Sequence, residues 1–338
     1  MDWALLLEWI IKSAIILVTM TVGFAYLTLF ERRILARLQV RIGPNRAGPF
    51  GLLQPVADAI KLIFKEELIP ARADKIIFVL APVITVFPAL VITAVIPWGT
   101  SITLFGRTIH LHLVDINVGA LYIMAVASIS VYGITLAGWS SNNKYAMLGG
   151  MRASAQMISY ELGLGLAFVP PIMLAGSMGL MAHVQTQAGM GLLKWWLYQP
   201  LGPLIFLISS IAEVNRAPFD MPEAEQELTA GYHTEYSGMK FALFFMAEYI
   251  KMIAVSMIAA TLFFGGYLGP FVDKFPILGP VYLTLKVLIL LFLMVWLRAT
   301  LPRIRYDRLM AFGWKVLLPA ALLNVLITAV LITLFGGH

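Results

Sequence analysis

Long apolar runs are the feature that most restricts how this chain can fold. A helix needs about 20 apolar residues to cross the hydrocarbon core of a bilayer, and the sequence contains eight such windows. They lie near residues 4–30, 76–98, 117–139, 155–178, 196–215, 239–266, 279–300 and 312–335. The fifth window contains Pro200 and Pro203, so we expect its helix to be short or kinked. Seven or nine spans also fit the pattern.

The composition agrees with a chain that lies in a membrane. Charged residues make up 12% of the chain and hydrophobic residues 60%, whereas a soluble domain is about 25% charged. No low-complexity linker and no repeat of fixed period divides the sequence, and the first apolar run lacks the features of a cleavable signal peptide. We therefore predict an all-α polytopic membrane protein with about eight transmembrane helices, forming a single membrane domain over residues 1–338.

Lysine and arginine residues are concentrated in alternate connections. The first, third, fifth and seventh loops with their flanks hold eighteen of the 24 basic residues. Cytoplasmic loops of membrane proteins carry the excess of lysine and arginine, so the odd-numbered loops are predicted to be cytoplasmic and both termini to lie outside. Because the net charge of +6 follows mostly from this topology, it gives no reason to expect a nucleic-acid partner.

The first loop contains a shorter helical pattern. Between residues 51 and 67, Leu52, Val56, Ile60 and Ile63 recur at helical spacing, and charged side chains occupy the other face. Such a pattern predicts an amphipathic helix in the cytoplasmic-side membrane interface. A surface anchor and a binding element fit this pattern equally well.

The fifth loop, near residues 213–238, is unusually acidic. It holds six of the eighteen acidic residues of the chain, namely Glu213, Asp220, Glu223, Glu225, Glu227 and Glu235. Asp220 followed by Glu223 would suit a helix N-terminus, which explains two of the acids. The other acids include like charges at helical spacing, which is unfavourable unless protons or cations such as Arg216 relieve it. A proton path or an electrostatic relay would need such a group of acids.

Two glutamates fall inside predicted spans. Glu161 would lie about 10 to 15 Å deep in the fourth span, and Glu248 lies at similar depth in the sixth, three residues before Lys251. Ionised groups at such depth are expensive unless paired or solvated, and they usually face the interior of the bundle. Glu248 with Lys251 would fit a static ion pair and Glu161 a hydrogen-bonded structural acid, but both acids are also candidates for a functional role.

The chain contains no cysteine, and its five histidines are scattered. The lack of cysteine excludes disulfides and thiolate-held iron–sulfur clusters in this chain. We expect no haem or metal centre here.

Four long segments carry a resemblance to a known family. They are ERRILARLQVRIGPNRAGPFGLLQPVADAIKLIFKE (31–66), GWSSNNKYAMLGGMRASAQMISYELGLGL (138–166), AEVNRAPFDMPEAEQELTAGYHTEYSGMKFALFFMAEY (212–249) and RATLPRIRYDRLMAFGWK (298–315). Together they closely resemble the H subunit of bacterial NADH:quinone oxidoreductase, respiratory complex I, whose mitochondrial counterpart is NADH dehydrogenase subunit 1. The resemblance covers nearly the whole chain in order and implies eight membrane helices plus an interfacial helix.

The resemblance also implies a function. The chain would be a non-redox subunit of a proton-pumping translocase in the bacterial cell (inner) membrane, forming the membrane end of the quinone tunnel and coupling quinone reduction to proton translocation. Quinone, either ubiquinone or menaquinone, would be the substrate, while FMN and the iron–sulfur clusters would lie on partner subunits. The partners would be the peripheral quinone-site and terminal iron–sulfur subunits and the small membrane subunits leading to the antiporter-like subunits. No activity is expected from the isolated chain, and the donor could be NADH or a variant such as ferredoxin.

Site residues follow from the matched motifs. Quinone binding would involve Arg32, Arg37, Asp58, Lys61, Arg216 and Phe219. The proton path or coupling would involve Glu161, Glu213, Glu223, Glu225, Glu227 and Glu248. Some family members carry a glutamate shortly before the VYG of the third span, where this chain has Ser128 and Ser130, so we leave the two serines out of the acid path.

Two other function classes remain as alternatives. A membrane anchor or ion-translocating subunit of a related hydrogenase or ferredoxin-linked complex would share the helix bundle. The GPNRAGPFG segment and the complete acid set of the fifth loop favour the quinone-linked complex. A stand-alone transporter would remain monomeric after mild solubilisation, which distinguishes it from both.

Overall fold

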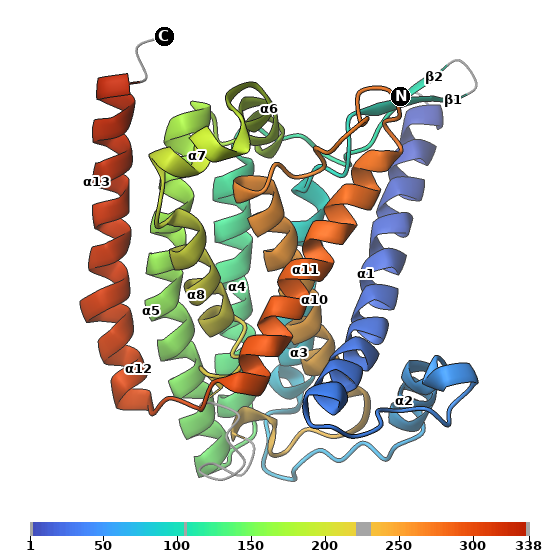
Figure 1. Cartoon of the computed structure of the whole chain (residues 1–338). Helices are drawn as coiled ribbons and strands as arrows, with labels where there is room; N and C mark the ends of the chain where they lie inside the picture. Colours follow the sequence, from blue (N-terminus) through green and yellow to red (C-terminus); the bar gives the residue numbers. More distant parts are fainter. Residues whose placement is uncertain (1–2, 105–106, 221–230, 336–338) are drawn as a thin grey trace.

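Membrane-length helices form most of the structure, a computed structural model that describes residues 3–104, 107–220 and 231–335. In these ranges seven helical segments are long and apolar enough to cross a membrane. They are α1 (Trp3–Leu38), α3 (Lys75–Ile92), α4 (Gly119–Ser140), α5 (Lys144–Ala175), α10 (Gly238–Phe263), α11 (Leu278–Thr300) and the continuous α12 (Tyr306–Phe312) and α13 (Leu318–Phe335), which a π-helical turn joins. The predicted all-α polytopic membrane fold is confirmed (Figure 1).

The fifth predicted span differs from the other seven. Residues 192–213 form two short helices, α7 (Leu192–Tyr198) and α8 (Gly202–Glu213), separated near Pro200. The 12 residues of α8 extend only about 18 Å, less than the hydrocarbon core of about 30 Å. As a result α8 ends inside the bundle, and the residues that follow it, 214–216, are buried. The prolines therefore produce a short helix whose end delivers polar residues to the interior.

The long helices surround α10. This helix packs against α1, α3 and α11, and all its residues from 249 to 263 are buried. Neighbouring contacts run from α3 to α4, from α4 to α5 and from α5 to α8 and α13. The outer faces of α1 and α13 expose large apolar side chains, among them Trp9, Val18 and Leu326. Such faces suit contact with lipid or with apolar neighbours rather than with water.

Local sequence explains where several helices begin and how closely they approach. The side chain of Asp74 accepts from the backbone N–H groups of Ile76 and Ile77 at 3.2 and 3.4 Å, which caps α3. Gly133 of α4 faces α3 so closely that a Cβ atom there would lie 2.9 Å from the carbonyl oxygen of Ala81. Gly176 ends α5 in the left-handed conformation, at φ 62°, which glycine adopts without a steric penalty.

The two ends of the bundle carry different short elements. Helix α1 begins and α13 ends at the same end (Figure 1), where α6 (Leu180–Met190), α7 and a two-stranded antiparallel hairpin also lie. The strands are β1 (Ser101–Leu104) and β2 (Arg107–His110), with Ser101 opposite His110. At the other end, α2 (Gln54–Ile63) lies beside α1, where the sequence predicts an amphipathic helix. The hairpin was not predicted because its strands have only four residues each.

Candidate functional site

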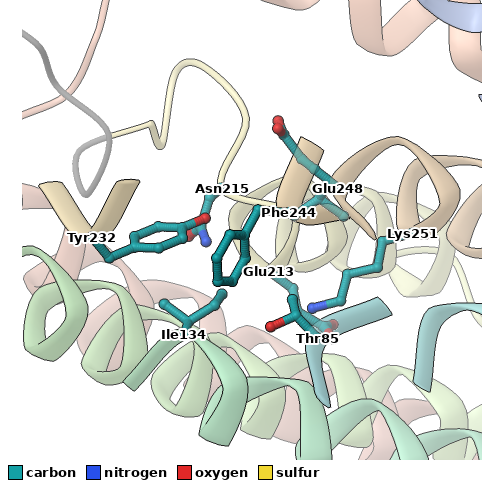
Figure 2. A pocket seen from close by; sticks show the side chains of 9 residues that line it. Thr85, Ile134, Glu213, Asn215, Tyr232, Phe244, Glu248 and Lys251 are labelled. Atoms are coloured by element: carbon teal, nitrogen blue, oxygen red, sulfur yellow. The ribbon is translucent and has the colours of Figure 1, made fainter. Parts of the chain in front are cut away.

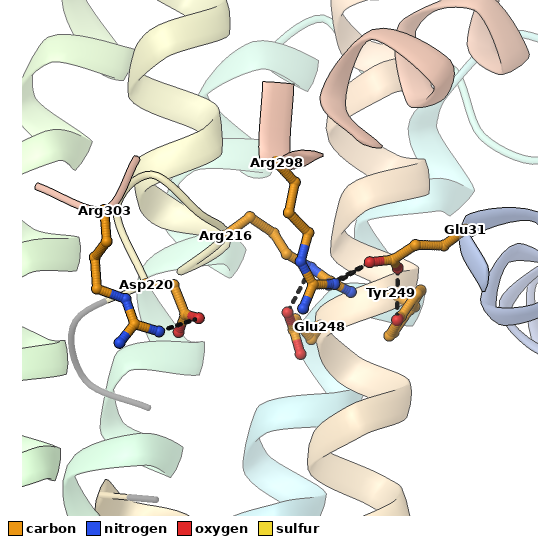
Figure 3. Close-up of polar contacts among 7 residues, drawn as sticks. All are labelled: Glu31, Arg216, Asp220, Glu248, Tyr249, Arg298 and Arg303. Atoms are coloured by element: carbon orange, nitrogen blue, oxygen red, sulfur yellow. Dashed lines mark hydrogen bonds and ion pairs between the residues drawn. The ribbon is translucent and has the colours of Figure 1, made fainter. Parts of the chain in front are cut away.

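A buried ionic cluster surrounds Arg216, in the loop that follows α8. The Nε atom of Arg216 lies 2.6 Å from Oε1 of Glu248 on α10, and its Nη1 atom lies 3.2 Å from Oε1 of Glu31 on α1. The exposed fraction of Arg216 is 7% and that of Glu31 is 2%. One guanidinium thus joins two carboxylates from different membrane helices (Figure 3), a geometry that its several N–H donors permit.

Two more side chains complete the cluster. The hydroxyl of Tyr249 donates to Oε2 of Glu31 at 2.6 Å, and the Arg216 guanidinium lies over the Tyr249 ring at 4.3 Å from its centroid. Arg298 of α11 also pairs with Glu31. Each buried charge is therefore matched, as low dielectric surroundings require.

The loop that carries Arg216 is held in place from α5. The amide nitrogen of Gln156, a fully buried residue, lies 2.8 Å from the carbonyl oxygens of both Ala212 and Phe219. It also lies 3.1 Å from Oδ1 of Asn215. These contacts give hydrogen-bond partners to carbonyl groups at the end of α8 and in the loop that follows it, both of which lie inside the bundle. Gln156 thereby holds the loop on both sides of Arg216.

A cavity of about 260 Å³ adjoins the ionic cluster. Its wall is mainly polar or charged and consists of Glu31, Arg32, Leu35, Asn215, Arg216, Asp220, Phe245, Glu248, Tyr249 and Arg298. Asp220 is itself paired with Arg303 at 3.1 Å. We call this space the charged cavity.

A larger cavity of about 470 Å³ lies between α1, α2 and α10. Its wall is mostly apolar, with Phe24, Leu62 and Met246 among its members. At one edge Nη1 of Arg32 lies 2.7 Å from Oδ2 of Asp58, and Lys61 lies 3.9 Å from the same carboxylate. Arg32 and Phe245 line both this apolar cavity and the charged cavity. The two spaces are therefore neighbours, one suited to an apolar chain and the other to polar atoms.

Further acids lie deeper in the bundle, on the far side of Glu248. Glu213, at the end of α8, is 7% exposed and lines a small cavity of about 20 Å³ with Thr85, Glu248 and Lys251 (Figure 2). Glu161 of α5 is hydrogen-bonded to Ser128 of α4. Acids therefore occur on α1, α5, α8 and α10.

The structure brings some of the predicted residues together and separates others. Arg32, Asp58 and Lys61 meet at the apolar cavity, and Arg216 lies in the charged cavity. Arg37, near the end of α1, is exposed and lines neither cavity. Phe219 is buried against Tyr160, with ring centroids 5.7 Å apart. Glu223, Glu225 and Glu227 lie outside the described residues.

Sequence reasoning missed several members of the site. Glu31, Tyr249 and Arg298 are part of the quoted family segments, but no spacing rule joins residues on three helices. The ion pair considered between Glu248 and Lys251 does not form, because Glu248 pairs with Arg216 and Lys251 donates to Ser130 instead. Ser128 and Ser130 were left out of the acid path, yet Ser128 is hydrogen-bonded to Glu161 of that path and Ser130 accepts from the buried Lys251.

Membrane-length helices enclose paired charges and further acids in this bundle. The fold and the site therefore define a polytopic membrane protein that keeps ionisable groups inside the bilayer region. The chain belongs to the NADH dehydrogenase family, whose sequence pattern matches residues 11–329. It is 52% identical to the H subunit of NADH-quinone oxidoreductase from Thermomicrobium roseum, over 99% of both chains. It is 54% identical to an H subunit of the same enzyme from Geobacter metallireducens over 94% of both chains, and 53% identical to the one from Protochlamydia amoebophila over 90% of this chain and 91% of the relative. The family resemblance of the sequence is confirmed.

Within the described ranges, no three histidine, aspartate or glutamate side chains are grouped so as to hold a metal ion. The charges of the ionic cluster are paired with one another.

Proposed function

We propose that this chain is the membrane subunit of NADH-quinone oxidoreductase that forms the membrane end of the quinone tunnel and couples quinone reduction to proton translocation. It would act as a non-redox subunit of a multi-subunit complex in the cell membrane, with quinone as substrate and with FMN and iron–sulfur clusters on partner subunits. Family membership and the arrangement of the two cavities support this proposal.

The adjacency of the two cavities is the observation that carries the proposal. A quinone has a long apolar tail and a head with two carbonyl oxygens, so it needs an apolar passage that ends among hydrogen-bond donors. The apolar cavity beside α2 offers the first and the charged cavity around Arg216 the second, and Arg32 and Phe245 line both. The tail would enter between α1, α2 and α10, and the head would move toward Arg32 and the ionic cluster.

The acids on the far side of Glu248 suit the coupling step. Reduction of a quinone to a quinol takes up two protons and changes the charge demand at the head. Glu248 lines both the charged cavity and the small cavity that contains Glu213, so a change at the head can act on Glu213 through neighbouring groups. Glu161 would continue this path on α5, and Glu223, Glu225 and Glu227 would supply its cytoplasmic part.

The position of the site suggests how the chain lies in the membrane. α2, Arg32 and the basic first loop lie at the end of the bundle opposite the start of α1 and the end of α13. Under the positive-inside rule that end would face the cytoplasm, with both termini outside and the bundle as one membrane domain. The peripheral quinone-site and iron–sulfur subunits would then dock over α2 and the fifth loop.

The proposed function is tested with the complex purified through a tag on this chain after gentle solubilisation. Co-purification of flavin and iron–sulfur signals with inhibitor-sensitive NADH:quinone reductase activity would support the proposal. Nickel–iron hydrogenase activity in place of quinone reductase activity would transfer the chain to the related hydrogenase complexes. A monomeric chain with no redox partner would refute the proposal.

The coupling role needs a second measurement. Glu213→Gln and Glu225→Gln are expected to lose quinone reductase activity or proton pumping while the complex still assembles. Normal turnover with normal proton stoichiometry in both variants would remove the acids from the mechanism and leave only the quinone-binding role.

A further inference from the structure

Lys251 is a buried cation in the middle of the membrane bundle. It belongs to α10, has an exposed fraction of 8%, and lies one turn beyond Glu248. Its Nζ atom donates to Oγ of Ser130 on α4 at 2.5 Å. Ser130 in turn donates to the carbonyl oxygen of Ala127 at 2.7 Å, so the hydroxyl has its own proton engaged and offers a lone pair to the lysine.

Three described acids of the path act on the charge of Lys251 without contacting it directly. Among the described residues, the carboxylates of Glu213, Glu161 and Glu248 act on its charge, and they come from α8, α5 and α10. Nevertheless, within the described part of the chain no carboxylate oxygen lies within 4.0 Å of its Nζ atom, and its direct partner is a neutral hydroxyl. The ammonium is therefore stabilised by charges at a distance rather than by a tight ion pair.

Space for proton transfer exists between Lys251 and Glu213. Both residues line the small cavity of about 20 Å³, together with Thr85 of α3 and Asn215. Figure 2 shows the amino group of Lys251 directed toward Glu213 and Thr85, whereas Glu248 points away. A cavity of this size accommodates about one water molecule. Oε2 of Glu213 is buried there without a hydrogen-bond partner in the described residues, so it can accept a hydrogen bond from a water molecule in this cavity.

We propose that Lys251 is a proton-carrying link between Glu213 and Glu161, a role that rests on the proposed acid path. In the first step the Lys251 ammonium gives a proton to the Glu161 carboxylate, which leaves a neutral amine and a carboxylic acid. In the second step a protonated Glu213 returns a proton to the amine and becomes a carboxylate. The net result moves one proton from Glu213 to Glu161 and restores Lys251. Lysine suits this role because a buried amine can release its proton.

The alternative is a fixed cation that only keeps the surrounding acids ionised. The two roles differ in what the side chain must do, because arginine keeps its charge and does not release a proton in proteins. Arginine in Lys251→Arg could therefore perform the role of a fixed cation but not that of a proton carrier. Lys251→His supplies a group that can both carry and release a proton, and Lys251→Met fills a similar volume with no charge.

The experiment uses the whole complex in proteoliposomes and compares proton translocation per electron with quinone reductase turnover. Lys251→Met and Lys251→Arg are both expected to lower proton translocation by roughly ten-fold or more, since a positioned proton-transfer group contributes about 10²-fold or more. Lys251→His should restore part of it, with a pH profile shifted toward acid. Among the described residues, the titratable groups that face this site are Glu213, Glu161, Glu248 and Tyr232, with Thr85 and Ser130 as hydroxyl neighbours.

Lys286→Met is the matched control. Lys286 is a membrane-helix lysine on α11 that donates to the carbonyl oxygens of Gly266 and Leu268 at 2.8 and 2.7 Å, away from the acid path. Its replacement should leave proton translocation per electron unchanged. Full pumping by Lys251→Arg, or by Lys251→Met, would overturn the proposal. Loss of pumping in Glu213→Gln with full pumping in Lys251→Met would reject Lys251 alone, whereas full pumping in both would reject the acid path itself.

Where Lys251→Arg prevents assembly because the larger side chain does not fit, Lys251→Met and Lys251→His still decide the question. Pumping lost in the first and partly restored in the second, at a shifted pH optimum, supports proton transfer. An equal loss of pumping in both variants overturns the proton-transfer proposal. If the lysine were merely structural, pumping would depend neither on the proton affinity of the replacing side chain nor on the pH.

Discussion

Arg216 and Glu248 form the central ion pair of the site, with Nε of the arginine 2.6 Å from Oε1 of the glutamate. The pair joins the loop after the short helix α8 to the buried helix α10. Because Glu248 lines both the charged cavity and the small cavity of Glu213, this pair is the closest connection between the proposed quinone head and the proposed acid path.

Arg216→Lys tests whether the shape of the guanidinium matters as well as its charge. A lysine cannot contact Glu248 and Glu31 in the same way and cannot stack flat on Tyr249. We expect the complex to assemble with quinone reductase activity reduced roughly ten-fold or more, since breaking one contact of a buried charged network costs a few kcal/mol. Turnover with quinone and with an artificial acceptor that takes electrons upstream of the quinone should be compared.

Tyr249→Phe provides the milder member of this series. It removes only the hydroxyl that donates to Glu31 and keeps the ring under Arg216. The expected loss of stabilising free energy in the ionic cluster is about 1.5–3 kcal/mol, the usual contribution of a hydrogen bond to a charged group. Unaltered quinone kinetics in both variants would show that the ionic cluster is a packing element and not part of the quinone site.

Asp58→Asn tests the edge of the apolar cavity. Asp58 pairs with Arg32 at 2.7 Å and is partly exposed. Loss of this ion pair should therefore weaken the free energy of quinone binding by up to about 1 kcal/mol. We expect the KM for quinone to rise by up to about five-fold with little change in kcat, because entry and not chemistry is affected.

Asp307→Asn is the control for the cavity edge. Asp307 forms an exposed pair with Arg305 at 3.4 Å and lines none of the cavities around the site. Its replacement should leave KM unchanged. Equal effects of the two substitutions would show that surface charge in general, and not the position of Asp58, determines quinone affinity.

The sequence predicted the elements of this fold better than their meeting points. Runs of apolar residues identify membrane helices because the bilayer sets their length, and Pro200 and Pro203 correctly indicated a short fifth helix. Nothing in the spacing, however, places Glu31 beside Arg216 or Lys251 beside Ser130, since these contacts join residues more than a hundred positions apart in sequence. The pairing of Glu248 with Arg216 instead of Lys251 follows from tertiary packing, which outweighs helical neighbourhood.

Gly133→Ala tests the close packing of α3 and α4. A methyl group at this position would lie 2.9 Å from the carbonyl oxygen of Ala81 and would also meet Thr85. Overpacking of this kind typically costs about 1–3 kcal/mol, so less assembled complex and a lower unfolding temperature are expected. The shift would also move Thr85, a wall residue of the small cavity.

Gly165→Ala serves as its matched control on α5. The nearest atom to a new Cβ there is the sulfur of Met124 at 3.6 Å, an ordinary contact with a flexible side chain. We expect normal assembly and a slightly more stable helix. If Gly133→Ala proved as harmless as Gly165→Ala, the close approach of α3 and α4 would not be needed for the fold.

Acid should destabilise the region around α6 through His183. This side chain is fully buried, and burial lowers the pKa of His183 to about 4, although the carbonyl of Pro171 offsets part of the shift. The unfolded segment, with an ordinary pKa of about 6.5, binds a proton more readily than the folded one. Stability is therefore fully present above about pH 6.5 and is lost as the pH falls toward about 4, by up to about 3 kcal/mol.

The measurement is hydrogen exchange of residues 180–190 in the whole complex at pH 5 and pH 7.5, with intrinsic exchange rates taken into account. Opening of α6 should become easier at pH 5 in the unmodified protein. His183→Gln keeps a polar side chain that does not titrate, so its opening free energy should be nearly the same at both pH values. If both proteins showed the same loss of protection at pH 5, groups other than His183 would cause the acid sensitivity. The pKa of His183 would then be the same in the folded and the unfolded segment.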